Sequence, residues 1–133
     1  MTDKVRILLV DDEPDLVKLV SVRLVSAGYD IVTAYDGQQA LEQVKLQKPS
    51  LIILDLMLPK LDGYKVCRLL KFDERYKNIP ILIFTARAQV EDIQLATHCG
   101  ADAYLTKPFD AKMLLDKLKE LLGRLPASKP GGA

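Results

Sequence analysis

The sequence predicts an α/β protein built on one doubly wound parallel sheet of five strands, with helices on both faces in a three-layer sandwich. Apolar runs of strand length alternate five times with stretches of helical periodicity, the pattern of repeated βαβ units. The third run, 51–54, has four large apolar residues in succession, as expected for a central strand buried on both faces. With 133 residues, the chain has the length of one domain. We expect the domain to span 1–123 and to be followed by a flexible tail or truncated linker, 124–133.

The first βα unit begins with a buried strand over 5–10, which ends in three consecutive acidic residues. Pro14 then suits the first turn of a helix, and Gly28 supplies a left-handed stop. The apolar residues of this helix fall on one face: Leu16, Val17, Val20 and Leu24.

The second strand covers 30–35, and Asp36 can cap the helix after it, which ends at Lys48-Pro49. Its inner face carries Ala40, Leu41 and Val44. The third strand, 51–54, leads directly to Asp55. An irregular loop with Pro59 and Asp62-Gly63 follows, then a short helix and a polar connector, 73–78. In that short helix we expect three apolar side chains to face inward: Val66, Leu69 and Leu70.

Pro80 precedes the fourth strand, 81–84, which ends in Thr85-Ala86. Residues 89–99 have weaker helical periodicity, with Ile93 and either Leu95 or Ala96 facing inward. The fifth strand covers 103–106 and is followed by Lys107-Pro108. Asp110 begins a last helix with a clear apolar stripe: Leu114, Leu118, Leu121 and Leu122.

The overall charge argues against several function classes. Nineteen basic and eighteen acidic residues give a net charge of +1, so the chain has neither the basic footprint of a nucleic-acid binder nor that of a membrane-surface protein. The two cysteines lack CxxC spacing, which argues against zinc and for plain thiols. No run reaches the ~18 apolar residues of a membrane span, so we expect a cytoplasmic protein.

Polar residues follow the predicted strands at the edge where ligands collect in open α/β sheets. Asp11 and Asp12 follow the first strand, Asp55 the third, Thr85 the fourth and Lys107 the fifth. Three crowded carboxylates repel one another, and at least one pKa should be raised unless a cation neutralises them. Oxygen ligands without His or Cys favour a hard ion, so the sequence predicts a Mg²⁺ site.

The same residues suit the acceptance of a phosphoryl group. Asp55 is an ionised carboxylate that needs no general base, while Lys107 and Thr85 can bind phosphoryl oxygens. Taken singly, these residues have plainer roles, because Asp12 could cap the first helix and Lys107 could be a solvated surface lysine. Their combination at one sheet edge favours phosphoryl acceptance.

Five motifs, in order, carry a family resemblance: Val-Asp11-Asp12-Glu13-Pro, Ile-Leu-Asp55-Leu-Met-Leu-Pro59, Asp62-Gly63, Phe-Thr85-Ala86 and Tyr104-Leu-Thr-Lys107-Pro108-Phe109. Over residues 4 to about 122 the chain resembles the receiver domains of two-component response regulators, such as the chemotaxis response regulator. The resemblance implies a flavodoxin-like (βα)5 fold with strand order 2-1-3-4-5. It also implies a phosphorelay signalling protein rather than an enzyme, beyond magnesium-dependent acceptance of its own phosphoryl group.

The resemblance assigns roles to individual residues. It implies that Asp55 is the phosphoacceptor and that Mg²⁺ is bound by Asp12 directly, by Asp11 through water, by Asp55 and by the backbone carbonyl of Met57. Contacts to the phosphoryl oxygens would come from Thr85 and Lys107. A shift of Thr85 would be coupled to rotation of Tyr104, for which a plain core or rim position is the alternative. The Lys107-Pro108 bond is expected to be cis.

The implied partners follow from the same family. The donor is a histidine kinase or a phosphotransfer protein, and a downstream effector reads the face formed by the fourth helix, fifth strand and fifth helix. No direct contact with nucleic acid or membrane is expected, and a phosphorylation-dependent dimer is left open.

Three other classes of protein fit the sequence less well. A haloacid-dehalogenase-type aspartyl-phosphate phosphatase needs a second aspartate two positions after the first, where this chain has Met57. A flavodoxin-like mononucleotide binder needs a Gly-rich phosphate loop, which does not follow the first strand. A receiver cut from a winged-helix transcription factor usually pairs charges across a dimer, at places that hold Ile93, His98, Ala103 and Met113 here. The sequence therefore favours a stand-alone receiver, or a module of another protein such as a hybrid kinase, over that third class.

Overall fold

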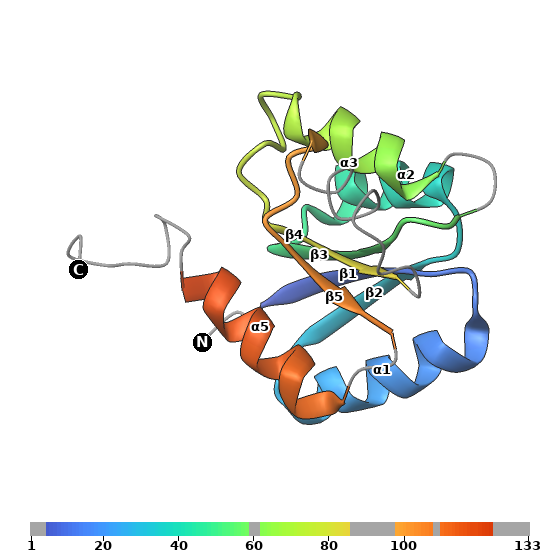
Figure 1. Cartoon of the computed structure of the whole chain (residues 1–133), viewed down its shortest axis with the longest axis vertical. Helices are drawn as coiled ribbons and strands as arrows, with labels where there is room; N and C mark the ends of the chain where they lie inside the picture. The colour runs from blue at the N-terminus through green and yellow to red at the C-terminus, as the bar shows by residue number, and fades with distance from the viewer. Residues whose placement is uncertain (1–4, 59–61, 86–97, 108–109, 124–133) are drawn as a thin grey trace.

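The computed structural model describes residues 5–58, 62–85, 98–107 and 110–123 (Figure 1). The described part contains one sheet of five parallel strands in the order β2-β1-β3-β4-β5. The strands are β1 Arg6–Val10, β2 Asp30–Ala34, β3 Leu51–Asp55, β4 Ile81–Thr85 and β5 Ala103–Thr106. The described helices are α1 Pro14–Ser26, α2 Gly37–Gln47, α3 Gly63–Lys71 and α5 Ala111–Gly123. The predicted doubly wound sheet and its strand order are confirmed.

The helices form two layers around the sheet. Figure 1 shows α2 and α3 on one face, and α1 and α5 on the other. Successive side chains of β1 point to opposite faces of the sheet. Ile7 and Leu9 pack in the core cluster with residues of α1 and α5, whereas Leu8 packs in the cluster with residues of α2 and α3. All five residues of β3 are buried, as predicted for the central strand. Asp55 is therefore the last residue of the most enclosed strand.

Local hydrogen bonds end the helices where the sequence indicates. Gly28 has φ of +99°, and its N–H donates to the Val25 carbonyl at 3.0 Å, while the Tyr29 N–H donates to the Leu24 carbonyl at 3.1 Å. This pair of bonds is a Schellman motif, which needs a left-handed residue. At the start of α2, the Asp36 carboxylate accepts the Gln39 N–H at 2.8 Å, which confirms the predicted cap.

The prediction for α3 is wrong at one residue. The sequence predicts that Leu69 faces inward, yet 54% of its surface is exposed. The helix buries Val66, Cys67 and Leu70 together with Gly63 at its start, a spacing of three and four residues that turns Leu69 outward. The error has a simple cause: four of the five positions before Lys71 are apolar, and the sequence alone does not fix which of them point to the sheet.

Several expectations lie outside the described residues. These are the inward-facing residues of the 89–99 segment, Pro59, the Lys107-Pro108 bond and the tail, 124–133. Both thiols are buried: the Cys67 Sγ donates to the Cys99 carbonyl at 3.6 Å. None of the helices in the described part is long and apolar enough to cross a bilayer.

Candidate functional site

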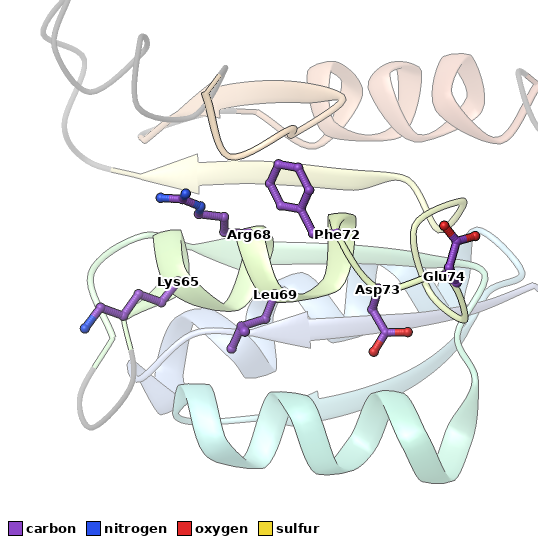
Figure 2. Close-up of a pocket in the computed structure, with 6 residues that line it drawn as sticks. All are labelled: Lys65, Arg68, Leu69, Phe72, Asp73 and Glu74. Carbon is purple, nitrogen blue, oxygen red and sulfur yellow. The ribbon is translucent and has the colours of Figure 1, made fainter.

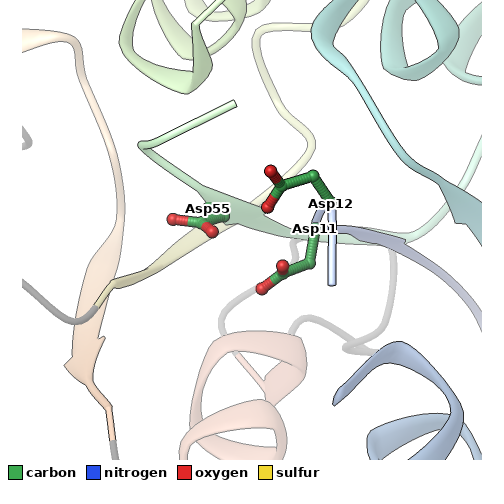
Figure 3. A group of neighbouring side chains, drawn as sticks. All are labelled: Asp11, Asp12 and Asp55. Atoms are coloured by element: carbon green, nitrogen blue, oxygen red, sulfur yellow. The ribbon is translucent and has the colours of Figure 1, made fainter. Parts of the chain in front are cut away.

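Three carboxylates meet at the carboxyl edge of the sheet. Asp11 and Asp12 follow β1, Asp55 ends β3, and each offers an oxygen so that the three atoms lie within 4.8 Å of one another (Figure 3). Asp11 and Asp55 are buried, with 0% and 4% of their surfaces exposed, whereas Asp12 is exposed. The predicted convergence is therefore present, and it has two enclosed acids and one at the rim.

Backbone N–H groups hold the two buried carboxylates. The Asp11 Oδ1 accepts the Glu13 N–H at 2.9 Å, and the Asp55 Oδ1 accepts the Met57 N–H at 3.0 Å. These short-range bonds fix each side chain with one oxygen toward the chain that follows its strand. The second oxygen of each carboxylate remains directed to the site.

Gly63 brings the start of α3 against the backbone of Asp55. A Cβ atom added at Gly63 would lie 1.9 Å from the Asp55 carbonyl oxygen, so no side chain fits there. The Gly63 N–H also donates to the Leu56 carbonyl at 3.1 Å. The close approach fixes the path of the chain just after Asp55.

Lys107, which follows β5, joins the two buried acids. Its Nζ donates to Asp11 Oδ2 at 2.7 Å and lies 3.3 Å from Asp55 Oδ2. It also reaches Glu13 Oε1 at 3.2 Å and lies 4.8 Å from the centre of the Phe84 ring. Only 14% of the lysine side chain is exposed. The predicted counter-charge is therefore in the site and partly desolvated, which strengthens its electrostatic interactions.

Burial and charge shift the pKa values at this site. Burial raises the pKa of Asp55 to about 6, and the Met57 N–H and the charge of Lys107 limit that rise, while the charge of Asp11 adds to it. The predicted raised pKa thus has a different main cause, since desolvation outweighs repulsion between the acids. For Lys107, burial lowers the pKa, but the bond to Asp11 and the charges of Asp55 and Asp11 outweigh it and leave the pKa raised.

The donor set fits a small divalent cation. Lys107 contacts three carboxylates of the site, including that of Glu13, and the exposed Asp12 adds a fourth, so negative charge is in excess at the site. Among the described residues of the site, the metal-binding atoms are carboxylate oxygens, which suit Mg²⁺ better than softer ions. The exposed position of Asp12 leaves room for water or a phosphate on the open side of such an ion.

Other predicted residues are only partly placed. Thr85 ends β4 next to Thr106, but its side chain lies outside the described part. Met57 has an exposed side chain, and its carbonyl as a metal ligand stays a prediction. Tyr104 lies on β5 with 43% of its surface exposed, so it is a rim residue in this state.

Sequence reasoning missed three contributors. Glu13 was visible as the third acid of its run, but nothing in the sequence placed it within reach of Lys107. For Phe84 the sequence predicts only a place in the apolar strand, whereas its ring lies beside Lys107. In the sequence Gly63 indicates only a loop, because its close approach to Asp55 depends on the fold.

Comparison with known proteins agrees with this geometry. The model of the response regulator receiver domain family matches residues 7–119, and the chain belongs to that family. It is 47% identical over 119 residues to the DNA-binding dual master transcriptional regulator RpaA of Synechocystis sp., covering 90% of this chain and 49% of that protein. It is 42% identical over 125 residues to the alkaline phosphatase synthesis transcriptional regulatory protein PhoP of Bacillus subtilis, covering 94% and 51%. The chain spans about half the length of these curated relatives.

Solved structures share the whole fold. A putative response regulator from Chloroflexus aurantiacus superposes with a TM-score of 0.88 at 32% identity, covering 92% of this chain and 100% of that one. The chemotaxis response regulator CheY4 of Vibrio cholerae gives a TM-score of 0.84 at 32% identity, covering 90% and 99%. The fold, the family and the role in two-component signal transduction are thus established together.

Proposed function

We propose that Asp55 is the residue of this receiver domain that accepts a phosphoryl group, from a histidine kinase or a phosphotransfer protein. The observation that carries the proposal is the bridge from Lys107 to both Asp11 and Asp55 across the strand ends, beside an oxygen-only donor set. A buried acid with a partly desolvated lysine at 3.3 Å suits a nucleophile whose product carries additional negative charge.

The transfer needs no proton acceptor on this chain. A carboxylate oxygen of Asp55 forms the new P–O bond as the bond from phosphorus to the donor nitrogen breaks, and the electron pair of that bond stays with the donor imidazole. Because the pKa of Asp55 is about 6, most of this carboxyl is ionised at neutral pH even without a metal. The nucleophile is therefore ready without a base.

Asp11, Asp12 and Asp55 would hold Mg²⁺, with the Met57 carbonyl as a further ligand. When bound, the ion neutralises the crowded carboxylates and the charge that develops on the phosphoryl oxygens. Met57 also contributes through its N–H, which fixes Asp55 Oδ1 at 3.0 Å. This hydrogen bond fixes one oxygen of the Asp55 carboxylate and leaves the other directed to the site.

Lys107 has to exchange contacts when Asp55 is modified. In this state it is shared among three carboxylates at 2.7 to 3.3 Å. A phosphoryl group on Asp55 adds acceptor oxygens in the same space, and Lys107 would bind one of them while Thr85 binds another. This exchange is the local event that a switch needs.

The output is proposed at the neighbouring surface. Tyr104 lies on β5 in register with Ile83 of β4, two positions before Thr85, and its partly exposed ring can turn inward if Thr85 moves. An effector that reads the β5 and α5 face would sense this change. The relatives named as transcriptional regulators favour a second candidate output, in which such a face controls a DNA-binding segment of a longer chain.

The test is intact-protein mass spectrometry after incubation with acetyl phosphate and Mg²⁺. Wild type should gain about 80 Da, and Asp55→Asn should gain nothing. Asp116→Asn, an exposed acid of α5, is the matched control and should label like wild type. Equal labelling of Asp55→Asn and wild type would refute the proposal.

A calorimetric titration tests the metal separately. Asp12→Ala removes the exposed member of the carboxylate set and should weaken Mg²⁺ binding. Wild-type affinity in that variant would place the ion elsewhere.

A further inference from the structure

The outward face of α3 carries apolar side chains that the domain itself leaves uncovered. Leu69 and Phe72 are 54% and 73% exposed, one turn apart at the end of the helix. They line a shallow hollow together with charged neighbours (Figure 2): Lys65, Arg68, Leu69, Phe72, Asp73 and Glu74. Exposed apolar side chains within one hollow are typical of a contact surface rather than of scattered surface residues.

The beginning of this face is basic. Figure 2 shows Lys65 in line with Leu69 on one side of α3, and Arg68 in line with Phe72 on the other. In the described part of the chain, no carboxylate pairs with Lys65 or Arg68. With respect to the described residues, both cations are therefore left for an acidic group from outside the molecule.

The far end of the same face is acidic. Asp73 and Glu74 follow the end of α3 and line the hollow. Their own partners are the exposed side chains of Arg75, at 2.8 Å, and Lys77, at 2.9 Å, which do not line it. The exposed pair of Glu74 with Lys77 contributes little free energy. Asp73 is held by two side-chain N–H groups of Arg75, but its Oδ2, which accepts the Arg75 Nη2–H at 2.8 Å, keeps a further lone pair for a new cation.

We propose that this face binds the same face of a second copy of the chain, with the two α3 helices antiparallel about a two-fold axis. Lys65 and Leu69 are one turn apart on α3, and Figure 2 shows Asp73, just past the end of the helix, on the same side as both. With the axis near Leu69, Lys65 of each copy meets Asp73 of the other. An interface of this kind is isologous, because each patch complements itself.

The order of side chains favours a second copy over an unrelated partner. One face holds a basic end, an apolar centre and an acidic end, so it already contains both halves of a complementary pair. Antiparallel pairing also sets Arg68 opposite Phe72 of the second copy, where a guanidinium can lie over the aromatic ring. Because only two large apolar side chains form the centre, the dimer is weak and forms at high protein concentration.

Sedimentation velocity over a concentration series tests the proposal, independently of phosphorylation. One variant reverses the basic end with Lys65→Glu and Arg68→Glu. A second changes the acidic end with Asp73→Asn and Glu74→Lys, since Asn keeps a carbonyl oxygen for the Arg75 N–H that Asp73 binds. The matched control, Lys18→Glu with Arg23→Glu, makes the same charge change on exposed positions of α1.

Wild type and the control should dimerise with rising concentration. Each charge variant alone should lose at least about tenfold in association constant, because like charges then face each other. An equimolar mixture of the two should associate again, since the reversed ends now match. A wild type that stays monomeric throughout, a mixture that does not associate, or a control that dissociates as well would overturn the proposal.

Discussion

Replacing Asp55 with Asn should stabilise the metal-free domain at neutral pH, although it removes a charged partner of Lys107. The pKa of Asp55 is raised to about 6 from 3.8, mainly by burial, so the folded state binds a proton more tightly than the unfolded chain does. Asn resembles the protonated, neutral form of the side chain. The variant therefore avoids the cost of placing a negative charge on the last residue of the most buried strand.

The size of this stabilisation follows from the shift in the pKa of Asp55. A difference of about two pKa units corresponds to about 3 kcal/mol at most. Solvent at the open side of the site screens the charge, so we expect about 1–2 kcal/mol in favour of the variant at neutral pH. The benefit that protonation gives the wild type is complete below the unfolded pKa and is lost as the pH rises through 6. When the pH falls from about 7.5 to about 5, the stability advantage of the variant over the wild type should narrow by about 1 kcal/mol.

Urea unfolding of both proteins at the two pH values, in the presence of a chelator, measures this difference. The other titrating groups are the same in both proteins. The pH dependence of the difference in their free energies of unfolding therefore reports on Asp55. Adding Mg²⁺ should favour the wild type, because a ligand that binds only the folded state stabilises it. A variant that is less stable than the wild type at both pH values, by the same amount, would refute burial as the main cause of the shift.

Three further substitutions, two of them with a matched control, test the packing at Asp55, the contacts of Lys71 and the phosphoryl transfer. Gly63→Ala places a methyl group on the chain at Asp55 and should cost about 2–4 kcal/mol in urea unfolding, whereas Gly123→Ala meets open space and should change stability by less than about 0.5 kcal/mol. Lys71→Met removes a donor from two carbonyl oxygens and the cation from Asp102, which keeps its bond from the Ile81 N–H, and should cost about 2–4 kcal/mol in the same assay. Lys112→Met removes only an exposed pair and should be near neutral; equal losses in the two lysine variants would contradict this reasoning. Lys107→Met should slow labelling by acetyl phosphate about 100-fold at saturating Mg²⁺, and an unchanged rate would remove the lysine from the transfer.

Patterns that act along the chain predicted most of the fold. Apolar runs located the strands, and the unbroken run before Asp55 identified the central one, because only a strand covered on both faces has no need for polar residues. The strand ends then predicted the meeting of Asp11, Asp55 and Lys107, since parallel strands bring their carboxyl ends to one edge.

Features that depend on contacts between distant elements could not be predicted in the same way. The orientation of Leu69 depends on how α3 is rotated against the sheet, and that rotation is fixed by the contact between Gly63 and Asp55. The reach of Glu13 to Lys107 spans 94 positions in sequence. The bonds from Lys71 to the Lys77 and Ile79 carbonyls similarly require the folded connector.

Chemical mapping of the modified residue tests the central claim most directly. Borohydride reduces an aspartyl phosphate to homoserine, and tryptic cleavage then yields the segment 46–60, in which Asp55 is the only acidic residue. After treatment with acetyl phosphate and Mg²⁺, we predict homoserine in this segment and none in the segment 7–18, which contains Asp11 and Asp12. Homoserine in 7–18, or an unchanged 46–60 segment from protein that has gained the phosphoryl mass, would contradict the assignment of Asp55 as the acceptor.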